Sequence, residues 1–199
     1  MCGRFTLTVD IEELQEAFPG VDFGLYMKPS YNIAPSQSIL SISNATPQKA
    51  QLFHWGLIPP WSKDKKIAYK MINARSETLA DKPSFKSPFR SKRCLILADG
   101  FYEWKKEGDK KIPTYIRLKS KKPFAFAGLW ETWIQEKNQP IHSCTIITTE
   151  ANPLLKPVHH RMPVILKKTD YDLWLDPTTV KPETLQHLLE PYDSNELEY

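Results

Sequence analysis

Proline is the residue that most constrains how this chain can fold. The sequence holds seventeen prolines and only seven glycines among 199 residues. Because proline lacks a backbone N–H and fits poorly inside helices and central strands, we expect short elements separated by many fixed turns. No repeat or linker interrupts the chain, so we expect a single domain over residues 1–199, with an acidic C-terminal tail at about 190–199.

Short runs with strand character outnumber helical patterns. The stretches expected to form strands are Phe5–Val9, Ser38–Ser43, Gln51–Trp55, Cys94–Ala98, Phe101–Lys105, Pro113–Leu118, Phe124–Gly128, Thr145–Thr148 and Val164–Leu166. Short helices are expected at Ile11–Phe18, with Asp10 as its cap, and at Ser76–Ala80, Tyr171–Leu175 and Glu183–Leu189. No regular strand–helix–strand alternation appears. The pattern therefore favours an α+β fold, with a bent antiparallel sheet or an open β-barrel-like core and peripheral short helices.

The composition is ordinary for a soluble globular protein, with 41% hydrophobic and 25% charged residues. No stretch approaches the ~20 apolar residues that span a bilayer. The first residues, Met-Cys-Gly-Arg-Phe-Thr, lack the apolar centre of a signal peptide. We therefore expect a cytoplasmic protein with no membrane partner.

The charge is unevenly distributed, although the net charge is only +4. Lysines and arginines are concentrated between Lys63 and Arg93, and acidic residues follow Pro182. We expect Leu57–Met71 to be an exposed loop. A basic middle segment fits a surface that binds a polyanion, and it fits an ordinary solvated face equally well.

The three cysteines form neither a disulfide framework nor a CxxC metal pair. Cys94 and Cys144 lie in apolar runs and are expected to be buried. Cys2 becomes the first residue once Met1 is removed, and it then carries an amine and a thiol on adjacent carbons. Such a 1,2-aminothiol condenses with an aldehyde, first to a Schiff base and then to a thiazolidine ring. Its position alone also fits a cysteine that merely follows the start methionine.

Two further segments carry groups suited to proton transfer. Glu103 lies between Tyr102 and Trp104, and dehydration by aromatic rings would raise its pKa into the range of a general acid or base. His159 and His160 precede an Arg-Met-Pro turn and titrate in the useful range. The alternatives are an outward-facing glutamate and ordinary loop histidines. No acidic or cysteine ligand stands at metal spacing, so no metal site is expected.

Polar and aromatic residues around the basic segment suggest contact with nucleic acid. Arg75 offers a planar fork that matches phosphate, and Asn73 can orient a substrate hydroxyl. The same segment also fits a helix start capped by Ser76. Trp61, between Pro60 and Ser62, is the tryptophan best placed for exposure, where it would stack on unpaired bases.

Together these segments resemble the SRAP domain family of abasic-site processing proteins, from Met1 to about Leu175. Each motif is weak alone, but their common order is specific. The motifs are Cys2-Gly3-Arg4-Phe5, Tyr31-Asn32-Ile33-Ala34-Pro35, Trp55-Gly56-Leu57-Ile58-Pro59 with Trp61, Asn73-Ala74-Arg75-Ser76-Glu77, Arg93-Cys94, Gly100-Phe101-Tyr102-Glu103-Trp104, Ala127-Gly128-Leu129-Trp130 and His159-His160-Arg161-Met162-Pro163.

The resemblance implies that Cys2 captures the ring-opened sugar aldehyde of an abasic site in single-stranded DNA as a thiazolidine, which shields the site from strand cleavage. It implies catalytic roles for Asn73, Glu103 and His159, with His160 at a variable position. The residues that it implies in DNA binding are Arg4, Asn32, Pro35, Trp61, Arg75, Arg90 and Arg161. It also implies lyase-type chemistry and removal of Met1 by the protein itself, with no cofactor. We expect a monomer that is associated with the nucleoid when bound to DNA.

Two other functions share part of this residue set. An N-terminal-nucleophile amidohydrolase or protease would use the Cys2 thiol with its own amine as base, but it has no use for the basic tryptophan loop. A non-catalytic reader of damaged DNA would use that loop but not Glu103 or His159.

Overall fold

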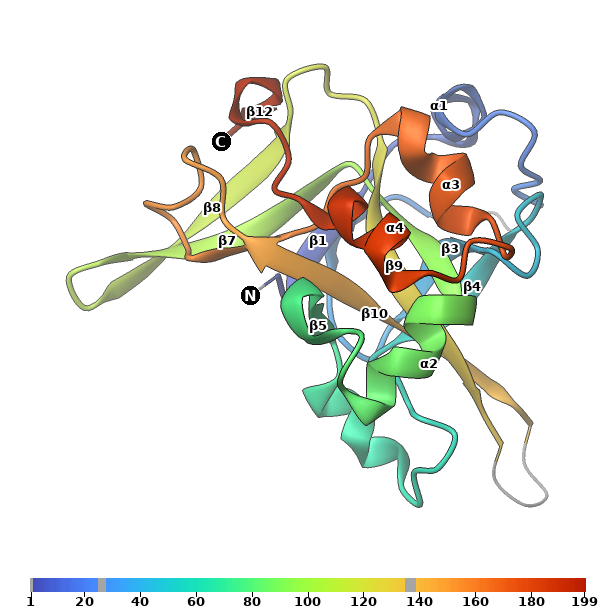
Figure 1. The fold of residues 1–199 in the computed structure, drawn as a ribbon. Coiled ribbons are helices and arrows are strands. Elements are labelled where there is room, and N and C mark those ends of the chain that lie inside the picture. Colours follow the sequence, from blue (N-terminus) through green and yellow to red (C-terminus); the bar gives the residue numbers. More distant parts are fainter. Residues whose placement is uncertain (1, 25–27, 135–138) are drawn as a thin grey trace.

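The computed structural model describes residues 2–24, 28–134 and 139–199. It is built on two sheets, with short helices at the periphery (Figure 1). The larger sheet contains β3 (Ser38–Ser43), β4 (Ala50–Trp55), β6 (Arg93–Ala98), β9 (Phe124–Trp133) and β10 (Ile141–Glu150). These strands follow the order β10-β4-β3-β6-β9, and β9 pairs back onto β10. The five strands therefore form a closed barrel.

Strand β10 is the most connected strand of the barrel. Its N-terminal half pairs with β9 and with β4, and the β4 pairing is parallel. Its C-terminal half pairs in parallel with β5 (Asn73–Arg75) and antiparallel with β11 (Arg161–Pro163). Segments that are far apart in the sequence thus meet along one strand.

The second sheet is antiparallel and leans against the barrel. Its order is β12-β8-β7-β1-β2, with bounds β1 (Arg4–Leu7), β2 (Ser30–Ile33), β7 (Gly100–Glu107), β8 (Lys110–Leu118) and β12 (Leu197–Glu198). Strands β7 and β8 form a long hairpin that projects away from the body of the molecule (Figure 1). Phe5 of β1 packs its ring on Trp55 and Phe126 of the barrel, at centroid distances of 5.1 and 5.8 Å.

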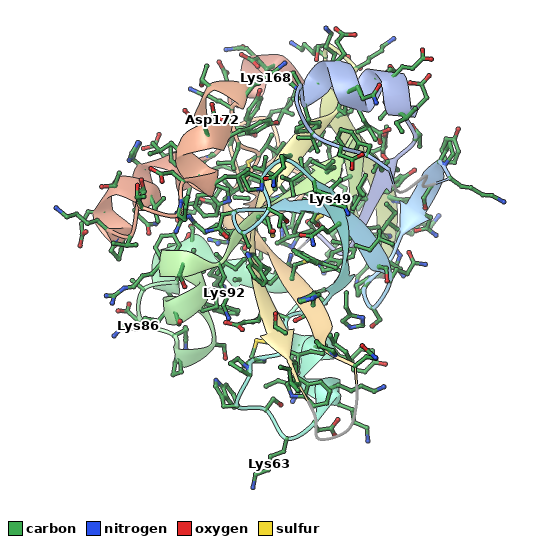
Figure 2. All side chains as sticks on the ribbon, turned by 90° about the vertical axis from the view of Figure 1, so that its right-hand side faces the viewer. Lys49, Lys63, Lys86, Lys92, Lys168 and Asp172 are labelled. Carbon is green, nitrogen blue, oxygen red and sulfur yellow. The ribbon has the colours of Figure 1, made fainter. Side chains whose placement is uncertain are left out.

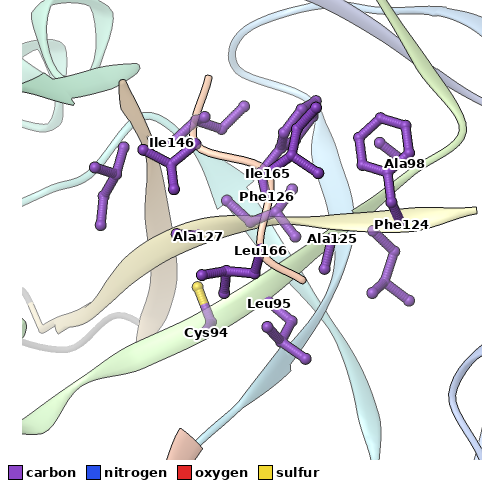
Figure 3. Packing of buried hydrophobic residues seen from close by; sticks show 14 of the residues in the cluster. Cys94, Leu95, Ala98, Phe124, Ala125, Phe126, Ala127, Ile146, Ile165 and Leu166 are labelled. Carbon is purple, nitrogen blue, oxygen red and sulfur yellow. The ribbon is translucent and has the colours of Figure 1, made fainter. Parts of the chain in front are cut away.

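The core lies inside the barrel and at its junction with the second sheet. Figure 3 shows Cys94, Leu95, Phe126 and Leu166 among the buried side chains that pack together in this core. Cys94 and Cys144 are fully buried, as their apolar surroundings predicted. A side chain at Gly128 would overlap Cys94 and Ile96, so glycine there lets the strands pack closely.

The helices are short and cover the outside. Asp10 is the N-cap of α1 (Ile11–Ala17). Its carboxylate accepts a hydrogen bond from the Glu13 N–H, and the Glu13 carboxylate accepts one from the Asp10 N–H. The remaining α-helices are α2 (Pro83–Ser91), α3 (Tyr171–Leu175) and α4 (Pro182–Gln186). Short 3₁₀ helices occur at Lys65–Lys70, Ser76–Thr78, Lys168–Asp170, His187–Leu189 and Ser194–Glu196. No described helix is long and apolar enough to cross a membrane.

The α+β class and most of the expected strands are confirmed. The structure adds that the pairing of β9 with β10 closes the barrel and that β4 and β10 pair in parallel. One expected strand needs correction. The first strand after residue 160 is Arg161–Pro163 and not Val164–Leu166, where Ile165 contributes only an isolated bridge. The acidic tail includes β12, which pairs with β8.

The segment Leu57–Met71 is only partly an exposed loop. Leu57 and Ile58 are buried, and Lys65–Lys70 form a 3₁₀ helix. Gly56 starts the segment with φ +128°, and a Cβ there would lie 2.6 Å from the Ala68 carbonyl oxygen. Glycine is therefore required at the point where this segment folds back on itself.

A buried cation joins the ends of α2 and α3. Arg93 is fully buried, and its guanidinium donates to the carbonyls of Phe89 and Arg90 at the end of α2. It also donates to the carbonyls of Trp174 and Asp176 at the end of α3, at 2.7 and 2.6 Å. Those carbonyls have no partner within their own helices, so one side chain satisfies both helix ends.

We predict that Arg93→Met lowers the free energy of unfolding by about 3 kcal/mol or more, because it leaves the buried carbonyls of Phe89 and Trp174 without donors. Urea unfolding followed by circular dichroism measures the change. Arg90→Met is the matched control, since its exposed side chain can be lost while its carbonyl stays, and it should shift stability by at most about 0.5 kcal/mol. A loss of less than 1 kcal/mol for Arg93→Met would contradict this role.

Candidate active site

Cys2 lies directly before β1 and is buried, with 1% of its surface exposed. Pairing of β1 with β2 on one side and with β7 on the other fixes where the residue stands. Burial raises the pKa of the Cys2 thiol well above its usual range, and the carboxylate of Glu103 raises it further. The group is therefore a neutral thiol at neutral pH. Met1 lies outside the described residues.

Glu103 enters the site from β7. Arg4 pairs with Tyr102, so continuing this register sets Glu103 opposite Gly3, next to Cys2. Its neighbours Tyr102 and Trp104 point to the other face of the strand, and Glu103 itself is only 3% exposed. Burial raises the pKa of this carboxyl. The sequence predicted the dehydration correctly but attributed it to the flanking aromatic residues, whereas it results from the packed side of the sheet.

His159 lies in the turn before β11, half-buried. Its Nδ1 accepts a hydrogen bond from the Arg161 backbone N–H at 2.9 Å. The Arg161 carbonyl oxygen lies 3.1 Å from the same Nδ1, so the backbone of Arg161 holds this edge of the ring. Burial lowers the pKa of His159, and the positive charge of the chain's amino terminus lowers it as well. The exposed His160 stacks on it with ring centroids 4.4 Å apart.

Asn73 begins β5 and is tied to the N-terminal strand through one tryptophan. The ring of Trp55 packs on Phe5, and its indole N–H donates to the Ile72 carbonyl at 3.0 Å, directly before Asn73. Both polar atoms of the Asn73 side chain are buried and have no hydrogen-bond partner among the described residues. Buried amides are normally satisfied, so this one is free to bind a ligand.

Arg161, which the resemblance places among the DNA-binding residues, is held by contacts within the protein. It is 6% exposed, and its guanidinium binds both carboxylate oxygens of Glu77 at 2.6 and 3.0 Å. It also donates to the Thr148 carbonyl of β10 at 2.7 Å. Little of this side chain is left to reach a DNA phosphate. It joins the segment after β5 to the turn that carries His159.

The other residues predicted to bind DNA lie on the surface. Asn32 and Arg75 are exposed on β2 and β5, and Pro35 follows β2 half-buried. Arg4 is half-buried beside Tyr102, and its Nη1 donates to the Gly3 carbonyl at 2.7 Å. Trp61 is 60% exposed. Figure 2 shows the nearby Lys63 reaching far out from the protein at the tip of this segment.

Arg90 stands apart from this set. It is exposed on α2, on the same helix as Lys86, which points outward in Figure 2. Among the described residues, no hydrogen bond or ion pair of its side chain links it to Cys2, Asn73, Glu103 or His159. A part in DNA binding stays a prediction for this residue.

Sequence reasoning missed two acidic side chains near the site. Glu77 lies inside a motif that was recognised, but nothing in the sequence pairs it with a residue 84 positions away. Asp99 follows the apolar strand β6, a position at which an aspartate usually indicates only a turn. Its buried hydrogen bond with Thr6 of β1 becomes visible only in the structure. No group of three His, Cys, Asp or Glu side chains in the described part of the chain is arranged to hold a metal ion.

Comparison with known proteins gives the family of this chain. The family described as SOS response associated peptidase (SRAP) matches residues 1–199. The chain belongs to the SRAP family. A relative in Bacillus subtilis, named abasic site processing protein YoqW, is 52% identical over 100% of this chain and 90% of its own length. The chicken protein named abasic site processing protein HMCES is 30% identical, covering 98% of this chain and 71% of the relative.

Solved structures share the fold of this SRAP chain. A protein of Bacteroides thetaiotaomicron superimposes with a TM-score of 0.91 at 28% identity, over 99% of this chain and 90% of the other. A protein of Bordetella bronchiseptica gives a TM-score of 0.85 at 26% identity, over 99% and 97%. The closed barrel with its leaning second sheet is therefore the architecture of the solved relatives too.

We predict that the His159 ring titrates below the value of about 6.5 for an unperturbed imidazole, because burial and nearby positive charge disfavour its protonation. Two-dimensional NMR of the histidine rings between pH 4.5 and 8 measures this midpoint, and the His159→Gln spectrum assigns the signal. A midpoint above 6.5 would contradict the expected effect of burial and nearby positive charge.

Proposed function

We propose that this protein processes abasic sites in single-stranded DNA by forming a covalent thiazolidine link through Cys2 after Met1 is removed. The observation that carries the proposal is the juxtaposition of Cys2 with the buried carboxyl of Glu103 at the start of β1. A ring-opened abasic sugar supplies the aldehyde with which a 1,2-aminothiol reacts. The names of the relatives support the same substrate class.

The chemistry divides into two steps. The amine of Cys2, whose ordinary pKa is roughly 8, adds to the aldehyde and loses water to give a Schiff base. The thiol then adds to the same carbon, with transfer of its proton to a nearby base, and closes the ring. In this proposal Glu103 assists sugar opening and accepts the thiol proton. His159 donates a proton to the sugar oxygen, and Asn73 holds the opened sugar.

Single-stranded DNA would reach the site along the exposed residues around it. Arg75 and Arg4 would contact the phosphates, and the exposed ring of Trp61 would stack on a base near the lysines of Leu57–Met71. Asn32 and Pro35 would shape the path along β2. We keep the expectations of a monomer and of a cytoplasmic protein that joins the nucleoid when bound to DNA.

We predict that Cys2→Ala abolishes the heat-stable adduct with single-stranded DNA carrying one abasic site. Without the thiol, the ring cannot close and only a hydrolysable Schiff base can form, which appears on a denaturing gel after borohydride treatment. Intact mass spectrometry should show wild-type protein without Met1 and the adduct mass on its N-terminal peptide. Cys94→Ala, which removes a buried thiol elsewhere, should still form the adduct. A heat-stable adduct with Cys2→Ala would refute the mechanism.

We predict an acid limb in the pH dependence of adduct formation, set by Glu103. Because burial raises the pKa of this carboxyl, its basic form is lost as the pH falls through a value above the ordinary 4.5, and the rate should fall there. Glu103→Gln should remove this limb and slow single-turnover adduct formation by roughly 10²–10⁴-fold. The titration of the α-amine near pH 8 should persist in both proteins. An unchanged profile in Glu103→Gln would contradict the assignment.

The family description gives one competing function a specific basis, since it names a peptidase. In this competing function the Cys2 thiol attacks an amide carbonyl, and the first amide to be cleaved is the peptide bond between Met1 and Cys2. Incubating purified protein that retains Met1 with and without abasic DNA separates the two functions. Release of Met1 followed by adduct formation fits one site with both activities, whereas turnover of an added peptide without any DNA adduct would favour the peptidase alone.

A further inference from the structure

A buried polar cluster joins the C-terminal end of β1 to the residue before β7. It lies at the other end of the paired segment from Cys2 and Glu103. Asp99 comes directly before β7 and is 6% exposed, and Thr6 of β1 is 2% exposed. The Thr6 hydroxyl donates to Asp99 Oδ1. Asp99 Oδ2 accepts from the Thr8 backbone N–H at 2.5 Å, from the Thr8 hydroxyl at 2.6 Å and from the Val9 N–H at 3.1 Å. Four donors therefore converge on one carboxylate.

Tyr115 of β8 completes the cluster. Its hydroxyl lies 3.0 Å from Thr6 Oγ1. Thr6 has a single hydroxyl proton, which goes to Asp99, so Tyr115 is the donor to Thr6. Gly100 makes room for this arrangement, since a Cβ there would overlap the Tyr115 hydroxyl. The relay Tyr115–Thr6–Asp99 thus links β8 to β1 and to the residue that directly precedes β7.

Regular backbone pairing between β1 and β7 is short. Within the described part of the chain, it is limited to Arg4, Phe5 and Thr6, which pair with Tyr102, Phe101 and Gly100. On the other side, pairing with β2 contains an irregularity between Phe5 and Leu7. Beyond Thr6, the link between the two strands passes through the Asp99 N–H, which donates to the Thr6 carbonyl at 2.9 Å, and through the Asp99 carboxylate. The register that sets Cys2 beside Glu103 therefore rests largely on this cluster.

From this geometry we infer that Asp99 and Thr6 are positioning residues that hold Cys2 in register with Glu103. The inference rests on the proposed function of the Cys2 site. The cluster touches neither group: Thr6 lies four residues after Cys2, and Asp99 four residues before Glu103. It acts through the two strands. Displacement of reacting groups by about 1 Å can cost up to about 100-fold in rate, so a loosened register would slow the reaction even in a folded protein.

The test uses Thr6→Val, which keeps the side chain's shape and removes its hydroxyl. The matched control is Thr145→Val, because Thr145 is fully buried in β10 and its hydroxyl has no partner among the described residues. Three quantities are measured on protein confirmed to lack Met1. They are the single-turnover rate of adduct formation across pH, the affinity for DNA with a tetrahydrofuran in place of the abasic sugar, and the unfolding midpoint.

We expect Thr6→Val to slow adduct formation by about 10- to 100-fold, with affinity for the tetrahydrofuran DNA within twofold of wild type. The acid limb of the rate should shift to lower pH as Glu103 becomes better hydrated. Thr145→Val should match wild type in both respects. Tyr115→Phe removes only the hydroxyl at the outer end of the relay, so it should show the same changes more weakly. It provides a second test if Thr6→Val does not fold.

Loss of stability with an unchanged rate and pH profile in both variants would overturn the inference, since the cluster would then serve the fold alone. Equal loss of rate and of tetrahydrofuran-DNA affinity would overturn it too, because the cluster would then act on DNA binding. Failure of wild-type protein to form any adduct is a separate outcome that refutes the proposed function itself.

Discussion

The pairing of β9 with β10 is the constraint on which the rest of this structure depends. By closing the barrel it fixes β10, and β10 then offers its remaining hydrogen-bonding groups to two short strands, β5 and β11. Neither short strand has enough pairing to be stable alone. One brings Asn73 to the site, and the other is preceded by the turn that carries His159. Arg161 and Glu77 then join the two segments directly.

The second sheet supplies the other half of the site through a small area of contact. Phe5 inserts its ring between Trp55 and Phe126, and this brings the chain end and Glu103 against the barrel. Dehydration at this junction acts on all three titratable groups in the direction of the neutral form. It raises the pKa of the Cys2 thiol and of the Glu103 carboxyl, and it lowers the pKa of His159.

Elements with local causes could be predicted from the sequence, and those with distant causes could not. Asp10 caps α1 through residues three positions away, and the apolar run of β6 is a barrel strand because its neighbours bury it. In contrast, β5 and β12 are only three and two residues long and exist because β10 and β8 accept them. Helix α2 was missed because Pro88 lies inside it, where packing of Phe85 and Phe89 outweighs the lost hydrogen bond. Likewise, the pairing of Arg161 with Glu77 could not be predicted, because the two residues are remote in sequence.

The burial of Cys2 also bears on the order of events in the proposed reaction. A thiol whose pKa is raised by burial is rarely a thiolate at neutral pH, so it is a poor first nucleophile. An α-amine with an ordinary pKa of roughly 8 has a larger neutral fraction, which favours Schiff base formation first. Once the iminium carbon is formed, its positive charge lies beside Cys2, which favours loss of the thiol proton to Glu103. Burial would thus restrain the thiol until the aldehyde is already bound, and the stable ring would follow from the unstable intermediate without release of the DNA.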